Sequence, residues 1–74
     1  MSSNMMDIKY SQRIRELMKE EKVNQVILSQ KIGVVQSTIS AWLNGKKEPS
    51  IKSLWLLADF FQVSIDYIVG RVEF

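Results

Sequence analysis

The sequence predicts an all-α domain of five short helices, and three observations support this fold class. Apolar residues recur with a helical period, most clearly between residues 8 and 22. Each of the three glycines follows a helical segment, where a left-handed residue commonly ends a helix. Five helices in 74 residues leave no room for a sheet. We expect the helices at 8–22, 25–32, 36–43, 51–61 and 65–69.

The first helix is predicted from an apolar stripe with charged residues on the opposite side. Asp7 is the expected N-cap, because its carboxylate can accept a hydrogen bond from the first amide groups. Arg15, Glu16, Lys19 and Glu20 face away from the stripe. The stripe itself consists of Ile8, Ile14, Leu17 and Met18.

The next two helices are expected to be only about two turns long. Asn24 caps the first of them, and Gly33 follows it as a left-handed C-terminal residue. Asn44 and Gly45 end the second. Ser29 supplies the small side chain that two steeply crossing helices need where their axes approach.

The remaining helices begin at serine caps. Residues 46–49 form a loop, Ser50 caps the helix at 51–61, and Ser64 caps the helix at 65–69, which ends at Gly70. No repeat, low-complexity segment or linker divides the chain, so we expect one domain over residues 1–74.

Composition excludes several classes of protein. No apolar run reaches the roughly 18 residues of a membrane span, and the first residues lack the layout of a signal peptide. The chain has no cysteine, although a secreted domain of this size usually needs disulfides. We therefore expect a cytoplasmic protein with no membrane partner. The net charge of +2 says little, but residues 22–47 contain four lysines and no carboxylate.

The segment at 36–43 has an unusual polar face. On a helical wheel its small polar residues occupy one arc, and Ile39 and Trp42 lie opposite. Short uncharged side chains let a backbone approach another surface, and Gln and Ser can donate to and accept from base edges in a DNA major groove. Taken alone, the arc is more simply explained as an ordinary hydrophilic face. The arc comprises Gln36, Ser37, Ser40, Ala41 and Asn44.

The spacing of these residues resembles the helix-turn-helix family of phage repressors and Cro proteins, the Xre-like transcriptional regulators. The 20-residue motif of that family maps onto Gln25 through Asn44. The likeness extends from RIREL at 13–17 through GKKEPS at 45–50 to SLWLLADFFQVSIDYIVG at 53–70, about four-fifths of the chain. Apolar, small and glycine positions of the motif are filled by Leu28, Ser29, Ile32, Gly33, Val34, Ile39 and Trp42.

This resemblance implies a lambda-repressor-like fold and a function. The chain would be a sequence-specific regulator of transcription, by default a repressor, that binds the major groove of operator DNA as a homodimer. Because the sequence ends at Phe74, a compact repressor, a Cro-like protein or a controller-type protein is the nearer comparison, unless the chain is a fragment. No cofactor, metal or small-molecule ligand is expected.

The resemblance also implies roles for individual residues. Gln36 is the first choice for specificity, because its amide can make a bidentate contact to adenine. For Arg13, a solvated or intrahelical charge and a contact to the DNA backbone are equally plausible, and we leave it out of the site. Base edges would be read by Gln36, Ser37, Ser40 and Ala41, and phosphates would be held by Asn24, Gln25, Asn44, Lys46 and, less strongly, Lys47.

Two departures from the family pattern lead to expectations of their own. Val35 stands where relatives have a capping Ser or Thr, so the first turn of the next helix is either frayed or Val35 touches DNA, for instance a thymine methyl. Met18 and Leu43 stand where many relatives have a partly buried Arg–Glu pair. Because both charges are replaced together, we expect the two apolar side chains to touch.

A two-fold contact outside the motif is needed to hold two recognition helices one turn of DNA apart. The C-terminal part is the expected source, because it has more apolar side chains than a small core can absorb, although Trp55 or Tyr67 alone could be core residues. We assign the interface to the last helix and tail, residues 65–74, chiefly Tyr67, Val72 and Phe74.

An enzyme is not expected. The sequence contains no His and no Cys, hence no ordinary general base near neutral pH and no thiolate nucleophile. The competing hypothesis is a protein-interaction module, such as an antitoxin-like partner that uses the same fold.

Overall fold

The computed structural model of the chain describes residues 8–74 and confirms the predicted all-α class. The described residues contain no strand. Its five helices are α1 (Tyr10–Glu21), α2 (Gln25–Ile32), α3 (Gln36–Leu43), α4 (Ile51–Phe61) and α5 (Ile65–Val69).

The start of α1 differs from the sequence prediction. Ile8 precedes the helix and is exposed, and Lys9 occupies the N-cap position without a side-chain hydrogen bond. The backbone N–H of Lys9 instead donates to the carbonyl of Val69, at 3.0 Å. That bond directs the chain before Tyr10 toward the end of α5, so the helix begins two residues later than the periodicity predicts. Asp7, the predicted cap, lies outside the described residues.

The other four helices have the predicted bounds. Asn24, Ser50 and Ser64 each accept a hydrogen bond from the backbone N–H three residues later, which is the predicted capping contact. Gly33 has φ of 72°, and an added Cβ there would meet nothing within 4 Å. The left-handed backbone alone therefore calls for glycine between α2 and α3.

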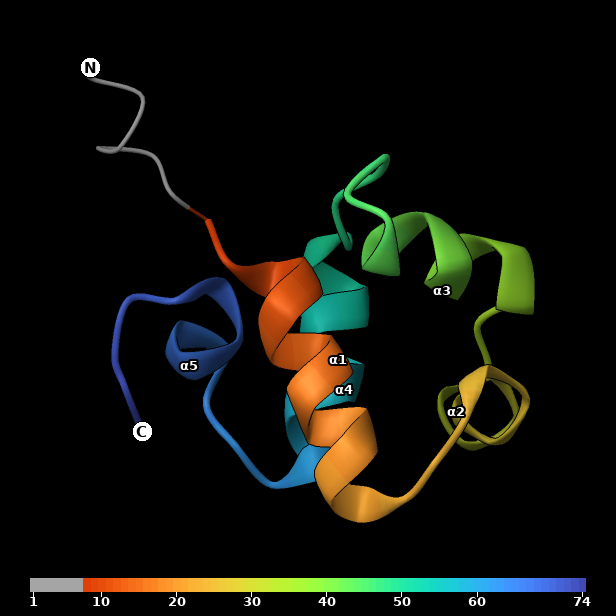
Figure 1. Cartoon of the computed structure of the whole chain (residues 1–74), viewed down its shortest axis with the longest axis horizontal. Helices are drawn as coiled ribbons and strands as arrows, with labels where there is room; N and C mark the ends of the chain where they lie inside the picture. The colour runs from red at the N-terminus through yellow and green to blue at the C-terminus, as the bar shows by residue number, and fades with distance from the viewer. Residues whose placement is uncertain (1–7) are drawn as a thin grey trace.

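Two helices form the centre of the molecule, and the others lie on either side of them. Figure 1 shows α1 in front of α4, with α2 and α3 on one side and α5 on the other. α1 packs against α3 and α5, whereas α2 packs against α3 and α4. The side of α3 that faces away from this packing is therefore free to meet another molecule.

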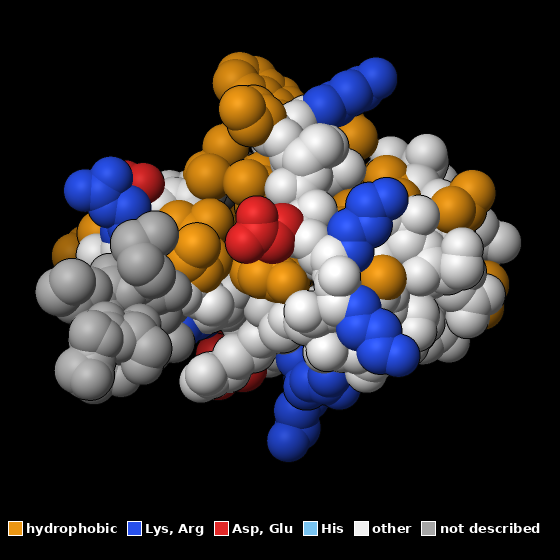
Figure 2. Space-filling model, turned by 90° about the horizontal axis from the view of Figure 1, so that it is seen from above, with side chains coloured by type: hydrophobic (Ala, Val, Ile, Leu, Met, Phe, Trp, Pro, Cys, Tyr) orange, Lys and Arg blue, Asp and Glu red, His pale blue; other side chains and the backbone are white. Residues whose placement is uncertain are grey.

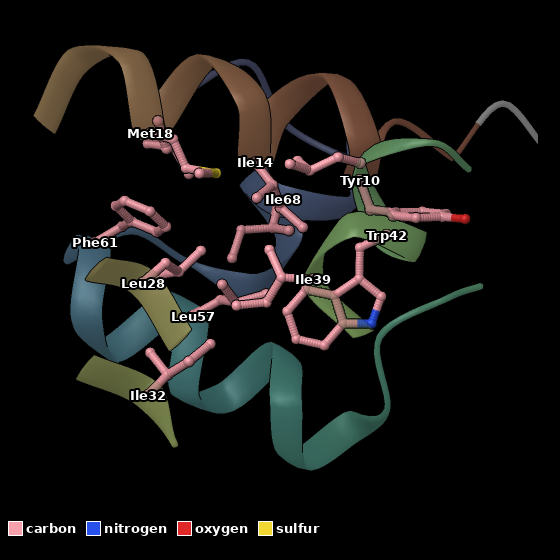
Figure 3. Close-up of a cluster of buried hydrophobic side chains, with 12 residues drawn as sticks. Tyr10, Ile14, Met18, Leu28, Ile32, Ile39, Trp42, Leu57, Phe61 and Ile68 are labelled. Carbon is pink, nitrogen blue, oxygen red and sulfur yellow. The ribbon is translucent and has the colours of Figure 1, made fainter. Parts of the chain in front are cut away.

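All five helices contribute to a single core. Ile14 of α1, Leu28 of α2, Ile39 of α3, Leu57 of α4 and Ile68 of α5 are fully buried and converge in its middle (Figure 3). Phe61 packs edge-on against Phe60, with ring centroids 4.9 Å apart. Because every helix depends on side chains of its neighbours, we expect the domain to unfold as one unit.

Several large apolar side chains stay outside this core. Trp55 is 68% exposed and Ile51 is 82% exposed on the outer side of α4. Trp55 is therefore not a core residue, whereas Tyr67 is half-buried. Within residues 8–74, no helix has both the length and the apolar character that crossing a membrane would require.

Met18 and Leu43 are both buried members of this core, on α1 and α3 respectively. Those two helices pack against each other. The expected contact between the two side chains stays a prediction, which a double-mutant cycle can test.

We expect Met18→Arg and Leu43→Glu each to lower the free energy of unfolding by about 3–5 kcal/mol, because each leaves one charge buried without a partner. If the side chains meet, the double variant should recover at least about 1 kcal/mol of the summed loss. Urea denaturation followed by circular dichroism measures all three variants. As a matched control, Met18→Arg is combined with Ile32→Glu on α2, a core position as buried as Leu43. Additive losses in both pairs would contradict the contact.

Candidate nucleic-acid interface

The N-terminus of α2 lies at the surface and is held by Asn24. Its side-chain oxygen accepts from the backbone N–H of Ile27 at 2.8 Å, and the side chain is exposed. Gln25, the first helical residue, is half-buried. The unpaired amide groups of a helix N-terminus attract anions, so Asn24 and Gln25 lie where a phosphate could bind.

After the turn that follows α2, α3 crosses α2 at a steep angle (Figure 1). The N–H of Gly33 donates to the carbonyl of Ser29 at 2.9 Å, which closes α2. Val34 is half-buried, and Val35 is 65% exposed at the N-cap of α3 with no side-chain hydrogen bond. As the sequence predicts, α3 has no side-chain N-cap, because an exposed valine occupies that position.

α3 separates its residues into two faces, as the helical wheel predicts. Ile39 and Trp42 have almost no exposed surface, and Leu43 is also buried. The opposite face is open: Gln36 and Ser37 are exposed, and Ser40 and Ala41 are half-buried. All four predicted base-reading residues therefore belong to one uncharged surface without a long side chain that would block a close approach.

The C-terminus of α3 places the other predicted phosphate residues beside this face. Asn44 is exposed, and its side-chain amide donates to the Ser40 hydroxyl at 3.5 Å. The backbone N–H groups of Lys46 and Lys47 both donate to the Ala41 carbonyl, at 2.9 and 3.3 Å. These bonds fold the loop back onto the helix end, and both lysine side chains project into solvent.

Basic side chains lie beside the exposed face of α3. Figure 2 looks onto the surface that includes the α3–α4 loop. It shows Lys or Arg side chains near that loop with an acidic side chain beside them, whereas the surface at the right of the view, over α3, is uncharged. The sequence contains no carboxylate between Lys22 and Lys47. Such a surface attracts a polyanion.

Two residues of α1 contact the end of α3, and the sequence analysis assigned neither of them a role. The Ser11 hydroxyl donates to the carbonyl of Trp42, and the Arg15 guanidinium donates to the carbonyl of Leu43 at 2.6 Å. Helical periodicity places Arg15 on the solvent side of α1, and the structure agrees that it is exposed. The spacing of four residues between Ser11 and Arg15 was the available signal, since it puts both on one side of α1.

The predicted dimer residues divide into two groups. Tyr67 and Val72 are half-buried, and their carbonyls accept hydrogen bonds from Arg13 at 2.8 and 3.0 Å. Phe74 is 93% exposed and thus free for a partner.

Arg13 differs from both sequence interpretations. It is buried rather than solvated, its guanidinium lies 4.3 Å from the centre of the Tyr67 ring, and it pairs with Glu73 at 3.6 Å. Its partners all belong to the C-terminal part of the chain, more than fifty positions away, so local periodicity could not identify them.

Comparisons with known proteins agree with this geometry. A helix-turn-helix family model matches residues 14–68. The HTH-type transcriptional regulator YobD of Bacillus subtilis is 38% identical over 64 residues, which are 86% of this chain and 57% of YobD. The chain thus spans little more than half the length of that relative, and about half of the other curated Bacillus relatives.

Solved structures give the same result for the fold. The P22 c2 repressor in complex with a synthetic operator has a TM-score of 0.79 at 32% identity, covering 85% of this chain and 96% of that one. The solution structure of its DNA-binding domain has a TM-score of 0.77 at 32% identity, with 84% and 82% covered. An Fe(II) HppE chain has a TM-score of 0.75 at 20% identity, covering 85% and 37%, and shares the fold alone.

The uncapped N-terminus of α3 leads to a stability prediction. Val35→Ser should raise the free energy of unfolding by about 1 kcal/mol, because a serine hydroxyl can accept from the amide groups of the first turn while an exposed valine contributes little packing. Asn24→Ala, which removes the existing cap of the neighbouring helix, should lower it by a similar amount. Urea denaturation measures both. A Val35→Ser variant that is less stable than the wild type would show that Val35 contributes to folding in another way.

Proposed function

The chain belongs to the helix-turn-helix family, and from this we propose that it is a cytoplasmic regulator of transcription that binds operator DNA as a homodimer through α3. Repression is the expected sign of regulation, because a protein bound at an operator excludes polymerase by its volume alone. The observation that supports this function best is the exposed, uncharged face of α3 opposite a buried face.

The proposed roles of the residues follow from their positions. Gln36, Ser37, Ser40 and Ala41 would read base edges, with Gln36 making the bidentate contact to adenine. The N-terminus of α2 and the loop after α3 would hold phosphates on either side of the groove, since they flank the face of α3. This phosphate-holding set comprises Asn24, Gln25, Asn44, Lys46 and Lys47.

The proposal draws support from the P22 c2 repressor, whose structure contains a synthetic operator. Its likeness covers residues on both sides of the motif, not the motif alone. The exposed lysines of the loop after α3 would attract the DNA backbone before any base is read.

A protein-interaction module is the second candidate, and the outer side of α4 favours it. Trp55 lines an open groove of about 460 Å³ whose other lining residues are Ala58, Asp59, Gln62, Val63, Ser64 and Ile65. Exposed tryptophan is enriched at protein interfaces.

Binding to a random-sequence duplex at several salt concentrations separates the two candidates. A DNA-binding domain should lose affinity steeply as salt rises, because lysine contacts to phosphates release counterions. Fluorescence anisotropy with a labelled duplex measures this. Undetectable binding at low salt would contradict the DNA-binding function and favour the interaction module.

The two classes of proposed contact should respond differently to substitution. Gln36→Ala should cost about 1–3 kcal/mol on the true operator and relax the preference at one base pair. Lys46→Ala should weaken binding to operator and random DNA about equally. Anisotropy titrations on both duplexes measure the difference, and uniform losses for both variants would contradict base reading by Gln36.

The proposed dimer interface can be tested at its exposed residue. Phe74→Ser should weaken self-association by roughly a hundredfold or more, because a two-fold dimer buries Phe74 of both protomers and burying each phenylalanine is worth about 1.5–3 kcal/mol. Ile51→Ser, an exposed apolar position on α4, is the matched control and should leave the dimer unchanged. Sedimentation equilibrium measures both variants. A wild-type chain that stays monomeric in solution and on DNA would contradict the homodimer.

A further inference from the structure

The C-terminus of α3 receives part of its positive charge from another helix. α3 has no basic residue in its last turn. Arg15 of α1 donates to the carbonyl of Leu43, the last residue of α3, at 2.6 Å. Ser11, one turn earlier on α1, donates to the preceding carbonyl, that of Trp42. The guanidinium of Arg15 therefore lies at the end of the helix that the proposed function places in the major groove.

This position matters for the electrostatics of DNA binding. The end of a helix has a partial negative charge of roughly half an electron, because its last carbonyls point outward. The residues that follow α3 at once include Asn44 and Lys46, to which we assign phosphate contacts. This partial charge opposes the binding of the phosphates that those residues hold, and Lys46 offsets it from the loop. Arg15 reverses the sign of the local charge.

The side chain of Arg15 also has donors to spare. A guanidinium has five N–H groups, and the hydrogen bond to Leu43 is the one that Arg15 makes among the described residues. The side chain is exposed, so its other donors face solvent. Because the bond to Leu43 already restricts the side chain, less conformational entropy would be lost when a second acceptor binds. Arginine also matches phosphate geometry better than lysine, since its donors are planar and paired.

We propose that Arg15 is a DNA-backbone residue whose guanidinium bridges the carbonyl end of α3 and a phosphate beside Asn44 and Lys46. This inference rests on the proposed DNA-binding function. It adds to the interface a cation from α1, outside the helix-turn-helix motif itself. By holding the end of α3 and the phosphate together, Arg15 fixes how the recognition helix lies relative to the DNA backbone.

The test compares the salt dependence of DNA binding in the wild type, Arg15→Gln, Arg15→Lys and Arg71→Gln. The last is a charge-matched control, because Arg71 is exposed and follows α5 on the far side of the molecule from α3 (Figure 1). Since Arg71 lies within the segment assigned to the dimer, its slope is compared at protein concentrations where sedimentation shows the wild-type oligomeric state. Anisotropy titrations use one random-sequence duplex from low to moderate salt. Circular dichroism melting checks that each variant is folded, and sedimentation checks that each has the wild-type oligomeric state.

For Arg15→Gln we expect roughly tenfold weaker binding at low salt, and a slope of log K against log salt that is smaller by about 0.9, the value of one lost phosphate contact. Arg15→Lys keeps the charge, so it should retain most of the slope while binding more weakly than the wild type. Arg71→Gln should keep the wild-type slope.

Three results would overturn the inference while the proposed function stands. A wild-type slope in Arg15→Gln would mean that Arg15 only caps α3. Equal losses of slope in Arg15→Gln and Arg71→Gln would mean that net charge alone matters. Should Arg15→Gln not fold, a wild-type affinity in Arg15→Lys would overturn the bridging contact. A wild type without salt-dependent binding would refute the proposed function, and this inference with it.

Discussion

The burial of one side of α3 is the constraint on which the rest of the structure depends. α3 has only eight residues, and isolated helices of that length are marginal in water. Its N-terminus has no side-chain cap to help it. Ile39 and Trp42, both almost fully buried, therefore hold the helix in place through tertiary contacts. Because a helix has a fixed period, burying that side determines which side chains face outward, and these are the small polar ones.

The core and the interface are thus two consequences of one arrangement. α1 and α2 pack against the buried side of α3, and α4 packs against α2. The same packing brings the N-terminus of α2 and the loop after α3 to the two ends of the exposed face. The C-terminus of α3 has additional support, because Ser11 and Arg15 hold its last carbonyls from α1. These contacts at its C-terminus help α3 to tolerate a valine at its N-cap.

Local sequence signals predicted most of the fold but not the contacts between distant segments. Capping residues and glycines act within three or four positions of the chain, so the bounds of α2, α3, α4 and α5 could be predicted correctly. The start of α1 could not, because it depends on a backbone bond from Lys9 to Val69. The sequence left the role of Arg13 open, and its burial could not be predicted for the same reason, since its partners lie in the C-terminal segment. The exposed face of α3 followed from periodicity, whereas the place of Arg15 at its end depended on the crossing of two helices.

The central claim is that this face reads DNA sequence in two symmetric copies. Selection of bound duplexes from a random-sequence library, by the wild-type chain at moderate salt, tests it most directly. The account predicts enrichment of a two-fold symmetric site whose half-site centres lie about 10 base pairs, or about 34 Å, apart. Bound duplexes with no enriched sequence would contradict base reading by α3, and an enriched site with a single unrepeated half would contradict the homodimer.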